Sequence, residues 1–281
     1  MSEDVVDLPK IAILGAGSMG RAILSGLLGP RARVEGGIVV TNRSAQAAAS
    51  FAGTEGVTAL ATEDDPGANR TAVAGAGIVL VAVKPAMVPD LLAEIADAVE
   101  SDAIVVSVAA GVTVARFEEL LPASVAVVRS MPNTPAVVGR AVTGVSAGTR
   151  STPDQVALVR RLFETVGTVV EVPESQLDAL STISGSGPAY VFLLIEQLTA
   201  AAVAKGFTPE QAGELVTGTF IGSAYLLEAS DKTPTELRIQ VTSPKGTTER
   251  AVAVLQDADL ESVFTRATDA ALARARELAA G

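Results

Sequence analysis

One stretch of the chain decides the fold: Lys10-Ile11-Ala12-Ile13-Leu14-Gly15-Ala16-Gly17-Ser18-Met19-Gly20. Its apolar first half predicts a strand, and its second half has the spacing G-x-G-x-x-G at the start of an expected helix. In such a turn the first glycine permits the tight bend, the second lets the backbone approach a pyrophosphate, and the third lets helix and strand pack closely. The free N–H groups of the helix N-terminus would then face the anion. The stretch therefore predicts a dinucleotide site.

Short apolar runs alternate with helix-like segments on both sides of this turn. Runs of Val and Ile that are continuous, rather than alternating with polar residues, are typical of strands buried on both faces. This pattern predicts an α/β fold with a doubly wound parallel sheet, and it favours a dinucleotide site over an ordinary glycine-rich turn. The strands are expected at 10–14, 37–41, 78–83, 104–108, 125–129 and 142–147, and the helices at 18–28, 44–51, 88–99, 114–121 and 153–166.

Strand signals end after about Val172, where a helical region begins. We therefore predict a Rossmann-type domain over residues 1–172 and an all-helical domain over 173–281. The segment Tyr190 to Ile195 has hardly a polar face, and a helix that is apolar all round must be buried all round. So small a helical domain cannot supply that cover alone, which predicts a partner subunit. The helices are expected at 188–205, 209–229, 235–241, 247–257 and 260–280.

Composition narrows the chemistry. The 281 residues carry a formal net charge of -11, so nucleic acid and anionic lipid surfaces are not expected partners. The chain contains no Cys and no His, which excludes thiol catalysis, Ser-His-Asp triads and the usual zinc ligands, and we expect no metal. Neither a signal peptide nor an apolar run of the ~20 residues that a bilayer span needs is apparent. We expect a cytoplasmic protein without a membrane partner.

The end of the second expected strand indicates which dinucleotide binds. An NAD site usually has Asp or Glu there, but this chain has Thr41-Asn42-Arg43-Ser44. Arg43 is suited to a 2′-phosphate, which favours NADPH and leaves NADH possible; a solvated surface arginine is the alternative. Lys84 and Ala110 follow two further strands at their carboxyl ends, where open α/β sheets bind ligands. For Lys84, simple solubility at a strand end is the alternative.

Six stretches, spread over nearly the whole chain, occur in the order typical of one family. Together they resemble the pyrroline-5-carboxylate reductases. The resemblance implies reduction of 1-pyrroline-5-carboxylate to L-proline with NAD(P)H, the last step of proline biosynthesis, by a homodimer that can assemble further into a decamer of five dimers. The stretches are residues 15–20, Ala82-Val83-Lys84-Pro85, residues 109–113, Met131-Pro132-Asn133-Thr134-Pro135, Ser184-Gly185-Ser186-Gly187-Pro188-Ala189-Tyr190 and Ser243-Pro244-Lys245-Gly246-Thr247-Thr248.

The resemblance also implies roles for single residues. The Thr248 hydroxyl would bond the ring nitrogen of the substrate, and backbone N–H groups near Thr247 would cradle its carboxylate; a plain helix N-cap is the alternative. The family more often has Gly where this chain has Lys245, and a side chain there limits positive φ. The implied substrate residues are Glu174, Ser243, Gly246, Thr247 and Thr248. The implied cofactor residues are Leu14, Gly15, Ala16, Gly17, Ser18, Met19, Asn42, Arg43, Ser44, Asn69, Ala82, Val83, Lys84, Ala110 and Gln240.

The absence of histidine is compatible with this chemistry. A cyclic imine carries its own proton in water, so the protein needs only to align the reacting carbon with the hydride donor and exclude water. Two alternatives stay open. One is a related Rossmann-fold imine reductase or dehydrogenase with another small substrate. The other is a non-catalytic nucleotide-binding assembly protein, which would bind the cofactor without turnover.

Overall fold

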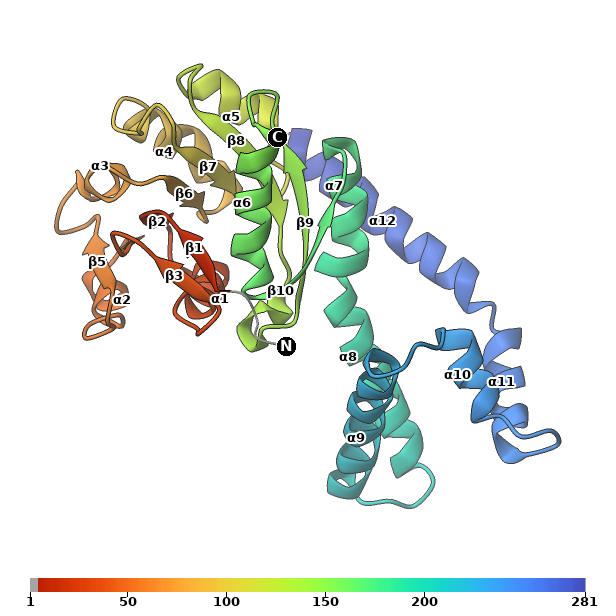
Figure 1. Cartoon of the computed structure of the whole chain (residues 1–281). Coiled ribbons are helices and arrows are strands. Elements are labelled where there is room, and N and C mark those ends of the chain that lie inside the picture. Colours follow the sequence, from red (N-terminus) through yellow and green to blue (C-terminus); the bar gives the residue numbers. More distant parts are fainter. Residues whose placement is uncertain (1–4, 281) are drawn as a thin grey trace. The chain divides into compact units, whose positions relative to one another are not determined.

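The structure, a computed structural model, describes residues 5–280 (Figure 1). Contacts divide the chain into two compact units. The first, here called the sheet unit, comprises residues 1–186 and 272–281. The second, the helical unit, comprises residues 187–271. The domain boundary expected at residues 172 and 173 remains a prediction.

An eight-stranded sheet forms the centre of the sheet unit, in the order β10-β9-β8-β7-β6-β2-β4-β5. All neighbours are parallel except β8 and β9, which pair antiparallel because a short connection, with no crossover helix, joins them. A separate parallel pair comprises β1 (Val6–Leu8) and β3 (Ala32–Val34). The eight strands are β2 (Ile11–Leu14), β4 (Ile38–Asn42), β5 (Val57–Ala61), β6 (Ile78–Val81), β7 (Ile104–Ser107), β8 (Ala126–Met131), β9 (Ala141–Ala147) and β10 (Gly167–Glu171). The predicted doubly wound α/β fold is confirmed, with one antiparallel pair added.

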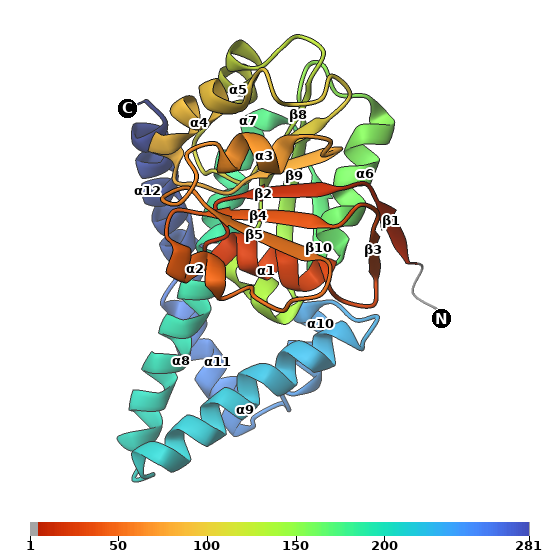
Figure 2. The ribbon, with the colours of Figure 1, turned by 90° about the vertical axis from the view of Figure 1, so that its left-hand side faces the viewer.

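Helices cover both faces of this sheet (Figure 2). One apolar cluster joins the sheet to α1 and α6, and a second joins it to α3, α4 and α5. The strands contribute fully buried side chains to both clusters, as their continuous apolar sequences predict. The helices of this unit are α1 (Ser18–Leu27), α2 (Ala45–Ala49), α3 (Ala68–Val73), α4 (Val88–Ile95), α5 (Val114–Leu120), α6 (Pro153–Glu164) and α7 (Glu174–Leu180), with 3₁₀ turns η1 (Pro85–Met87) and η2 (Thr134–Val138) and a π-helical turn η3 (Ser181–Gly185).

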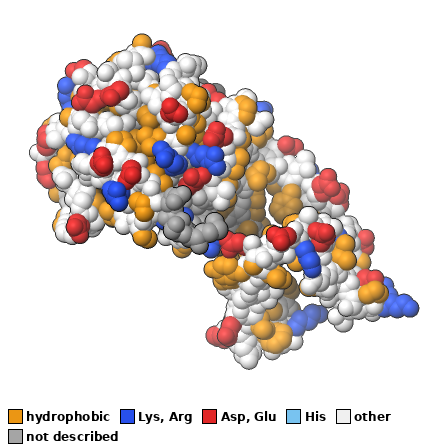
Figure 3. Space-filling view, in the orientation of Figure 1, with side chains coloured by type: hydrophobic (Ala, Val, Ile, Leu, Met, Phe, Trp, Pro, Cys, Tyr) orange, Lys and Arg blue, Asp and Glu red, His pale blue; other side chains and the backbone are white. Residues whose placement is uncertain are grey.

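The helices predicted for the second half are all present. They are α8 (Gly187–Val203), α9 (Pro209–Glu228), α10 (Pro234–Gln240), α11 (Thr247–Asp257) and α12 (Leu260–Ala280), whose last residues belong to the sheet unit. Thr208 and Thr233 form capping boxes at the starts of α9 and α10. Hydrophobic side chains lie on the surface of the helical unit (Figure 3), among them Phe192 and Leu193 at 61% and 54% exposure.

One helical run, Glu174–Val203, is long and apolar enough to cross a membrane when judged by length and composition alone. The run is longer than the sequence analysis expected, because α7, the π-helical turn and α8 follow one another almost without interruption. A single helix of this kind is weak grounds for a membrane protein, since an apolar helix that packs against a partner passes the same test.

Burial in the sheet unit predicts a difference between two leucine variants. Leu92 of α4 is fully buried, whereas Leu28 is 44% exposed. We expect Leu92→Ala to lower the free energy of unfolding by about 2–5 kcal/mol, because it leaves a cavity, and Leu28→Ala by less than about 1 kcal/mol. Urea unfolding of both variants, followed by circular dichroism, measures the difference. Equal losses would contradict this assignment of the core.

Candidate dinucleotide and substrate site

The glycine-rich turn lies between the end of β2 and the start of α1. The backbone N–H groups of Gly15 and Ala16 both donate to the Thr41 carbonyl, at 3.1 and 3.0 Å, which ties the turn to the end of β4. Gly15 has φ +88°, and a Cβ there would lie 2.8 Å from Val83 Cγ1. A side chain at Gly15 is therefore excluded twice, by conformation and by space.

Gly17 has a different environment. A Cβ added there would meet nothing within 4 Å, and its φ of -76° is open to any residue. It is the N-cap of α1, and no side chain caps the helix. The first N–H groups of α1 thus border open space, which fits a pyrophosphate and the close approach inferred from the sequence.

A cavity of about 390 Å³ continues from this turn. Two of the residues that line it contain a buried acceptor oxygen, Asn42 Oδ1 and Glu94 Oε1, with no hydrogen-bond partner in the described part of the chain. Buried acceptors of this kind suit a ligand with hydroxyl or amino donors, such as an adenosine. Of the predicted cofactor residues, the cavity brings together Gly15, Asn42, Arg43, Asn69 and Val83.

Arg43 and Ser44, which follow β4, have defined contacts. Arg43 is exposed and approaches Met87 Sδ at 3.9 Å, and Ser44 Oγ accepts from the Ala47 N–H as the N-cap of α2. The structure also brings a carboxylate here that the sequence reasoning missed. Glu63, just after β5, accepts from the Ala45 N–H. Glu63 thus joins the end of β5 to the start of α2, and it is not among the residues that line the cavity.

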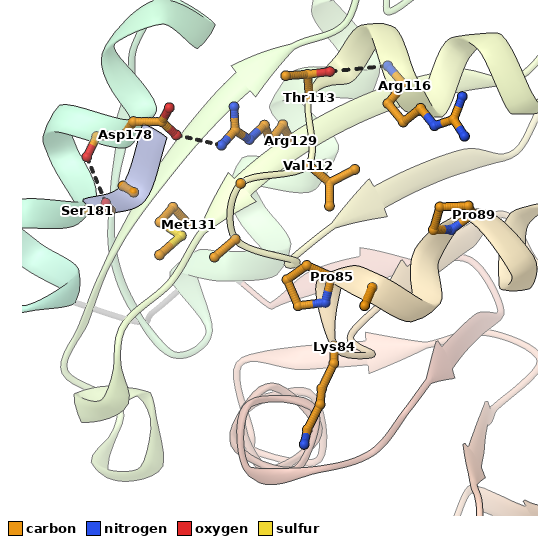
Figure 4. Close-up of a pocket in the computed structure, with 14 residues that line it drawn as sticks. Lys84, Pro85, Pro89, Val112, Thr113, Arg116, Arg129, Met131, Asp178 and Ser181 are labelled. Atoms are coloured by element: carbon orange, nitrogen blue, oxygen red, sulfur yellow. Dashed lines mark hydrogen bonds and ion pairs between the residues drawn. The ribbon is translucent and has the colours of Figure 1, made fainter. Parts of the chain in front are cut away.

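A larger cavity of about 1080 Å³ lies on the other side of the Lys84 loop (Figure 4). Ala86 lines both cavities, so the loop after β6 separates them. Lys84 extends away from Arg129 and Asp178, which point toward each other. The predicted cofactor residues Lys84 and Ala110 line this cavity. The remaining ones in this unit, Leu14, Ala16, Gly17, Ser18, Met19, Ser44 and Ala82, line neither cavity.

Glu174 has a defined structural role. Its Oε1 accepts from the Val114 N–H at 2.7 Å and from Arg129 Nη1 at 3.2 Å. Arg129, only 6% exposed, also donates to Asp178 Oδ1 at 2.8 Å. Glu174 therefore joins the start of α5 to β8 and α7, beside the large cavity but not among its lining residues. Its predicted contact with the substrate remains a prediction.

The other predicted substrate residues lie in the helical unit, on the loop before α11 and in the first turn of this helix. Gly246, not a threonine, is the N-cap of this helix, and no side chain caps it. Thr247 and Thr248 are thus the first two residues of α11, which removes the plain N-cap alternative for both hydroxyls. Lys245 has φ +62°, so the left-handed conformation is present although Lys245 carries a side chain. On α10, Gln240 Oε1 accepts from Lys232 Nζ at 2.6 Å.

Two further features of the site, besides Glu63, were not predicted from the sequence. Arg129 lies within an apolar strand, and a charged residue in such a run is a signal that could have identified the buried ion pairs. Glu94 gave no such signal, because it lies on the polar side of an ordinary amphipathic helix. Its contact with Asn69 Nδ2, at 3.1 Å, depends on the packing of α3 against α4.

These features define a class of protein. The strand order β5-β4-β2-β6-β7-β8, the glycine turn and the adjoining cavities are those of a Rossmann-fold, dinucleotide-dependent oxidoreductase. Two family models match the chain: "NADP oxidoreductase coenzyme F420-dependent" over residues 10–111, and "Pyrroline-5-carboxylate reductase dimerisation" over residues 174–278.

Curated relatives and solved structures narrow the class. The chain is 41% identical to a pyrroline-5-carboxylate reductase of Mycobacterium tuberculosis, over 96% of this chain and 97% of the relative. It resembles the structure of the Coxiella burnetii pyrroline-5-carboxylate reductase with a TM-score of 0.88 and 37% identity, over 95% and 97% of the two chains. A Plasmodium falciparum pyrroline carboxylate reductase with NADP bound shares the fold, with a TM-score of 0.79 at 24% identity, over 96% and 98% of the two chains. The chain belongs to the pyrroline-5-carboxylate reductase family.

The two glycines of the turn predict contrasting variants. Gly17→Ala should leave thermal stability unchanged and weaken NADPH binding about tenfold or more, because its methyl group would overpack against the bound pyrophosphate. Gly15→Ala should lower stability by about 1 kcal/mol or more, because alanine disfavours positive φ. Thermal unfolding and fluorescence titration with NADPH measure both effects. Unaltered NADPH affinity in Gly17→Ala would remove this turn from the binding site.

Proposed function

We infer that the chain reduces 1-pyrroline-5-carboxylate to L-proline with NAD(P)H, the last step of proline biosynthesis. The observation that carries this inference is full-length similarity to pyrroline-5-carboxylate reductases, in a chain that keeps both the glycine-rich turn and the Ser243–Thr248 loop. When bound, the cofactor supplies the hydride. The protein binds the two reactants, aligns them and excludes water.

The proposed division of roles follows the two units. The turn from Leu14 to Met19 holds the pyrophosphate, the smaller cavity holds the adenosine, and Lys84 and Ala110 lie along the nicotinamide half. In the helical unit, backbone N–H groups at the start of α11 receive the substrate carboxylate and Thr248 bonds its ring nitrogen. This role is supported by a helix start that no side chain caps. Ser243 and Gly246 shape the same loop, and Gln240 reaches the nicotinamide end.

We propose NADPH as the preferred cofactor, with NADH accepted. Arg43 offers a charge-assisted bond to a 2′-phosphate, and the Glu63 carboxylate is bonded to the Ala45 N–H. Since Arg43 lines the smaller cavity and Glu63 does not, we expect the arginine to decide the preference.

The proposed assembly is a homodimer in which a second copy covers the exposed apolar side chains of α8 and α9. The dimerisation match over residues 174–278 supports this pairing, and a decamer of five dimers is the proposed larger form. We further propose a cytoplasmic location, and a dinucleotide-binding domain over 1–172 followed by a substrate and dimerisation domain over 173–281.

Mixing purified protein with NADPH and racemic pyrroline-5-carboxylate, and following the loss of reduced cofactor together with the formation of proline, tests the function. Turnover is expected only when all three components are present. NADPH binding without turnover would favour a nucleotide-binding assembly protein. Faster turnover of another cyclic imine or a small carbonyl compound would favour a related reductase.

Arg43 is the subject of the cofactor prediction. Arg43→Ala should reduce the preference for NADPH over NADH by about 1.5–3 kcal/mol, or roughly tenfold to a hundredfold, because a charge-assisted bond to the 2′-phosphate is lost. The ratio of kcat/KM for the two cofactors measures it. Arg33→Ala serves as a control, because Arg33 is exposed and paired with Asp7 on a different strand pair. Equal turnover with both cofactors in the unmutated protein would contradict the prediction.

Thr248 is the subject of the substrate prediction. Thr248→Val keeps the shape of the side chain and removes the hydroxyl. The value of kcat/KM for pyrroline-5-carboxylate should therefore fall roughly fivefold to a hundredfold, which corresponds to about 1–3 kcal/mol of lost transition-state stabilisation. The affinity for NADPH should barely change. Thr247→Val is the matched control and should cost less, because only its backbone N–H has an assigned role. A loss explained wholly by weaker NADPH binding would remove Thr248 from the substrate site.

A further inference from the structure

The loop before α11 contains a backbone conformation that its sequence does not favour. Lys245 has φ +62°, a region in which the Cβ of an L-residue is crowded. The other non-glycine residue with positive φ among the described residues is Asp259. Its short side chain accepts from the Ser262 N–H nearby, which is the usual compensation for this conformation. The Lys245 side chain has no acceptor and cannot compensate in this way.

Glu249 supplies the missing compensation. Its Oε2 accepts from the Lys245 N–H at 2.9 Å. Glu249 is the third residue of α11, and Lys245 is the residue before the N-cap of this helix. In an ordinary capping box the carboxylate would instead bond the N–H of the N-cap itself. Here that group, on Gly246, donates to the Ser243 carbonyl at 3.0 Å.

Two hydrogen bonds, one to the Ser243 carbonyl and one to Glu249, hold this loop. A Cβ at Gly246 would lie 2.9 Å from the Ser243 carbonyl oxygen, so the Ser243 bond needs glycine at this position. The Glu249 bond holds the residue before it. Together they fix the chain that enters α11, and they leave the N–H groups of Thr247 and Thr248 uncapped by any side chain.

We propose that Glu249 is a positioning residue of this reductase: its bond to the Lys245 N–H holds the substrate loop in the left-handed conformation that presents Thr247 and Thr248. The proposal rests on the proposed function for its effect on turnover. The conformation of the loop should depend on Glu249 whether or not substrate is reduced. Glu249 matters because position 245 is lysine, and it should matter little if that position were glycine, which adopts positive φ freely.

A double-mutant cycle on the full-length protein tests this coupling, with the variants Glu249→Ala, Lys245→Gly and both together. Glu249→Ala should raise KM for pyrroline-5-carboxylate about fivefold to tenfold, the worth of one hydrogen bond, with little change in NADPH affinity. In the Lys245→Gly background the same change should cost less than about twofold. Glu249→Gln keeps an acceptor oxygen without the charge, and should retain most of the substrate affinity.

Amide hydrogen exchange over residues 243–248 is the second measurement, and it needs no substrate. Exchange should rise in Glu249→Ala; in the double variant it should return over residues 246–248, whereas the N–H of residue 245 stays without its acceptor in both variants. Glu261→Ala is the control, because it removes a carboxylate from the first turn of α12. Equal losses of substrate affinity in the two backgrounds, an equal loss in Glu249→Gln and Glu249→Ala, or unaltered exchange would overturn the proposal. An unmutated protein that does not reduce pyrroline-5-carboxylate would overturn the proposed function instead, and exchange would still decide whether Glu249 holds the loop.

Discussion

The sheet unit depends on one shared acceptor. Two successive N–H groups, those of Gly15 and Ala16, donate to the Thr41 carbonyl at the end of β4. This fork fixes the direction in which the chain leaves β2, and with it the start of α1. It also places Asn42 against the turn, where its Nδ2 donates to the Ala16 carbonyl at 3.1 Å. The ends of the first two sheet strands thus form one rigid corner, and the smaller cavity begins there.

A second constraint acts at the other end of the same sheet edge. The Arg129 side chain is buried and would be costly without its partners, so Glu174 and Asp178 must stay beside it. Glu174 also accepts from the first N–H group of α5, immediately after the loop that contains Ala110. The network therefore stabilises the wall of the larger cavity as well as the packing of α7. These hydrogen-bonded ion pairs are directional, so they hold the neighbouring loop in one position. Apolar contacts, which are not directional, would not do so.

Most of the fold follows from the sequence, and the exceptions have physical causes. The strands at 78–81 and 104–107 are continuous apolar runs, and the glycine spacing identifies the first turn. In contrast, β5 (Val57–Ala61) is half exposed at the sheet edge, and its mixed sequence gives no strand signal. The extent of the run from α7 to α8 was also missed, because Ser184-Gly185-Ser186-Gly187-Pro188 has the composition of a turn yet lies in or beside helix. Tertiary packing overrides local propensity at both places.

The site shows the same division between short-range and long-range information. Residues that act through the backbone, such as Gly15 and Gly17, are predictable because their roles depend on local conformation. Contacts such as those of Glu63 with Ala45 and of Glu94 with Asn69 join different elements, so no spacing in the sequence predicts them. Glu249 is an intermediate case, because its contact with Lys245 spans a single turn. The pair is readable in the sequence only once the conformation of residue 245 is known, since lysine by itself does not indicate positive φ. Departures from a family pattern are thus best interpreted with their neighbours, where a compensating residue can lie one helical turn away.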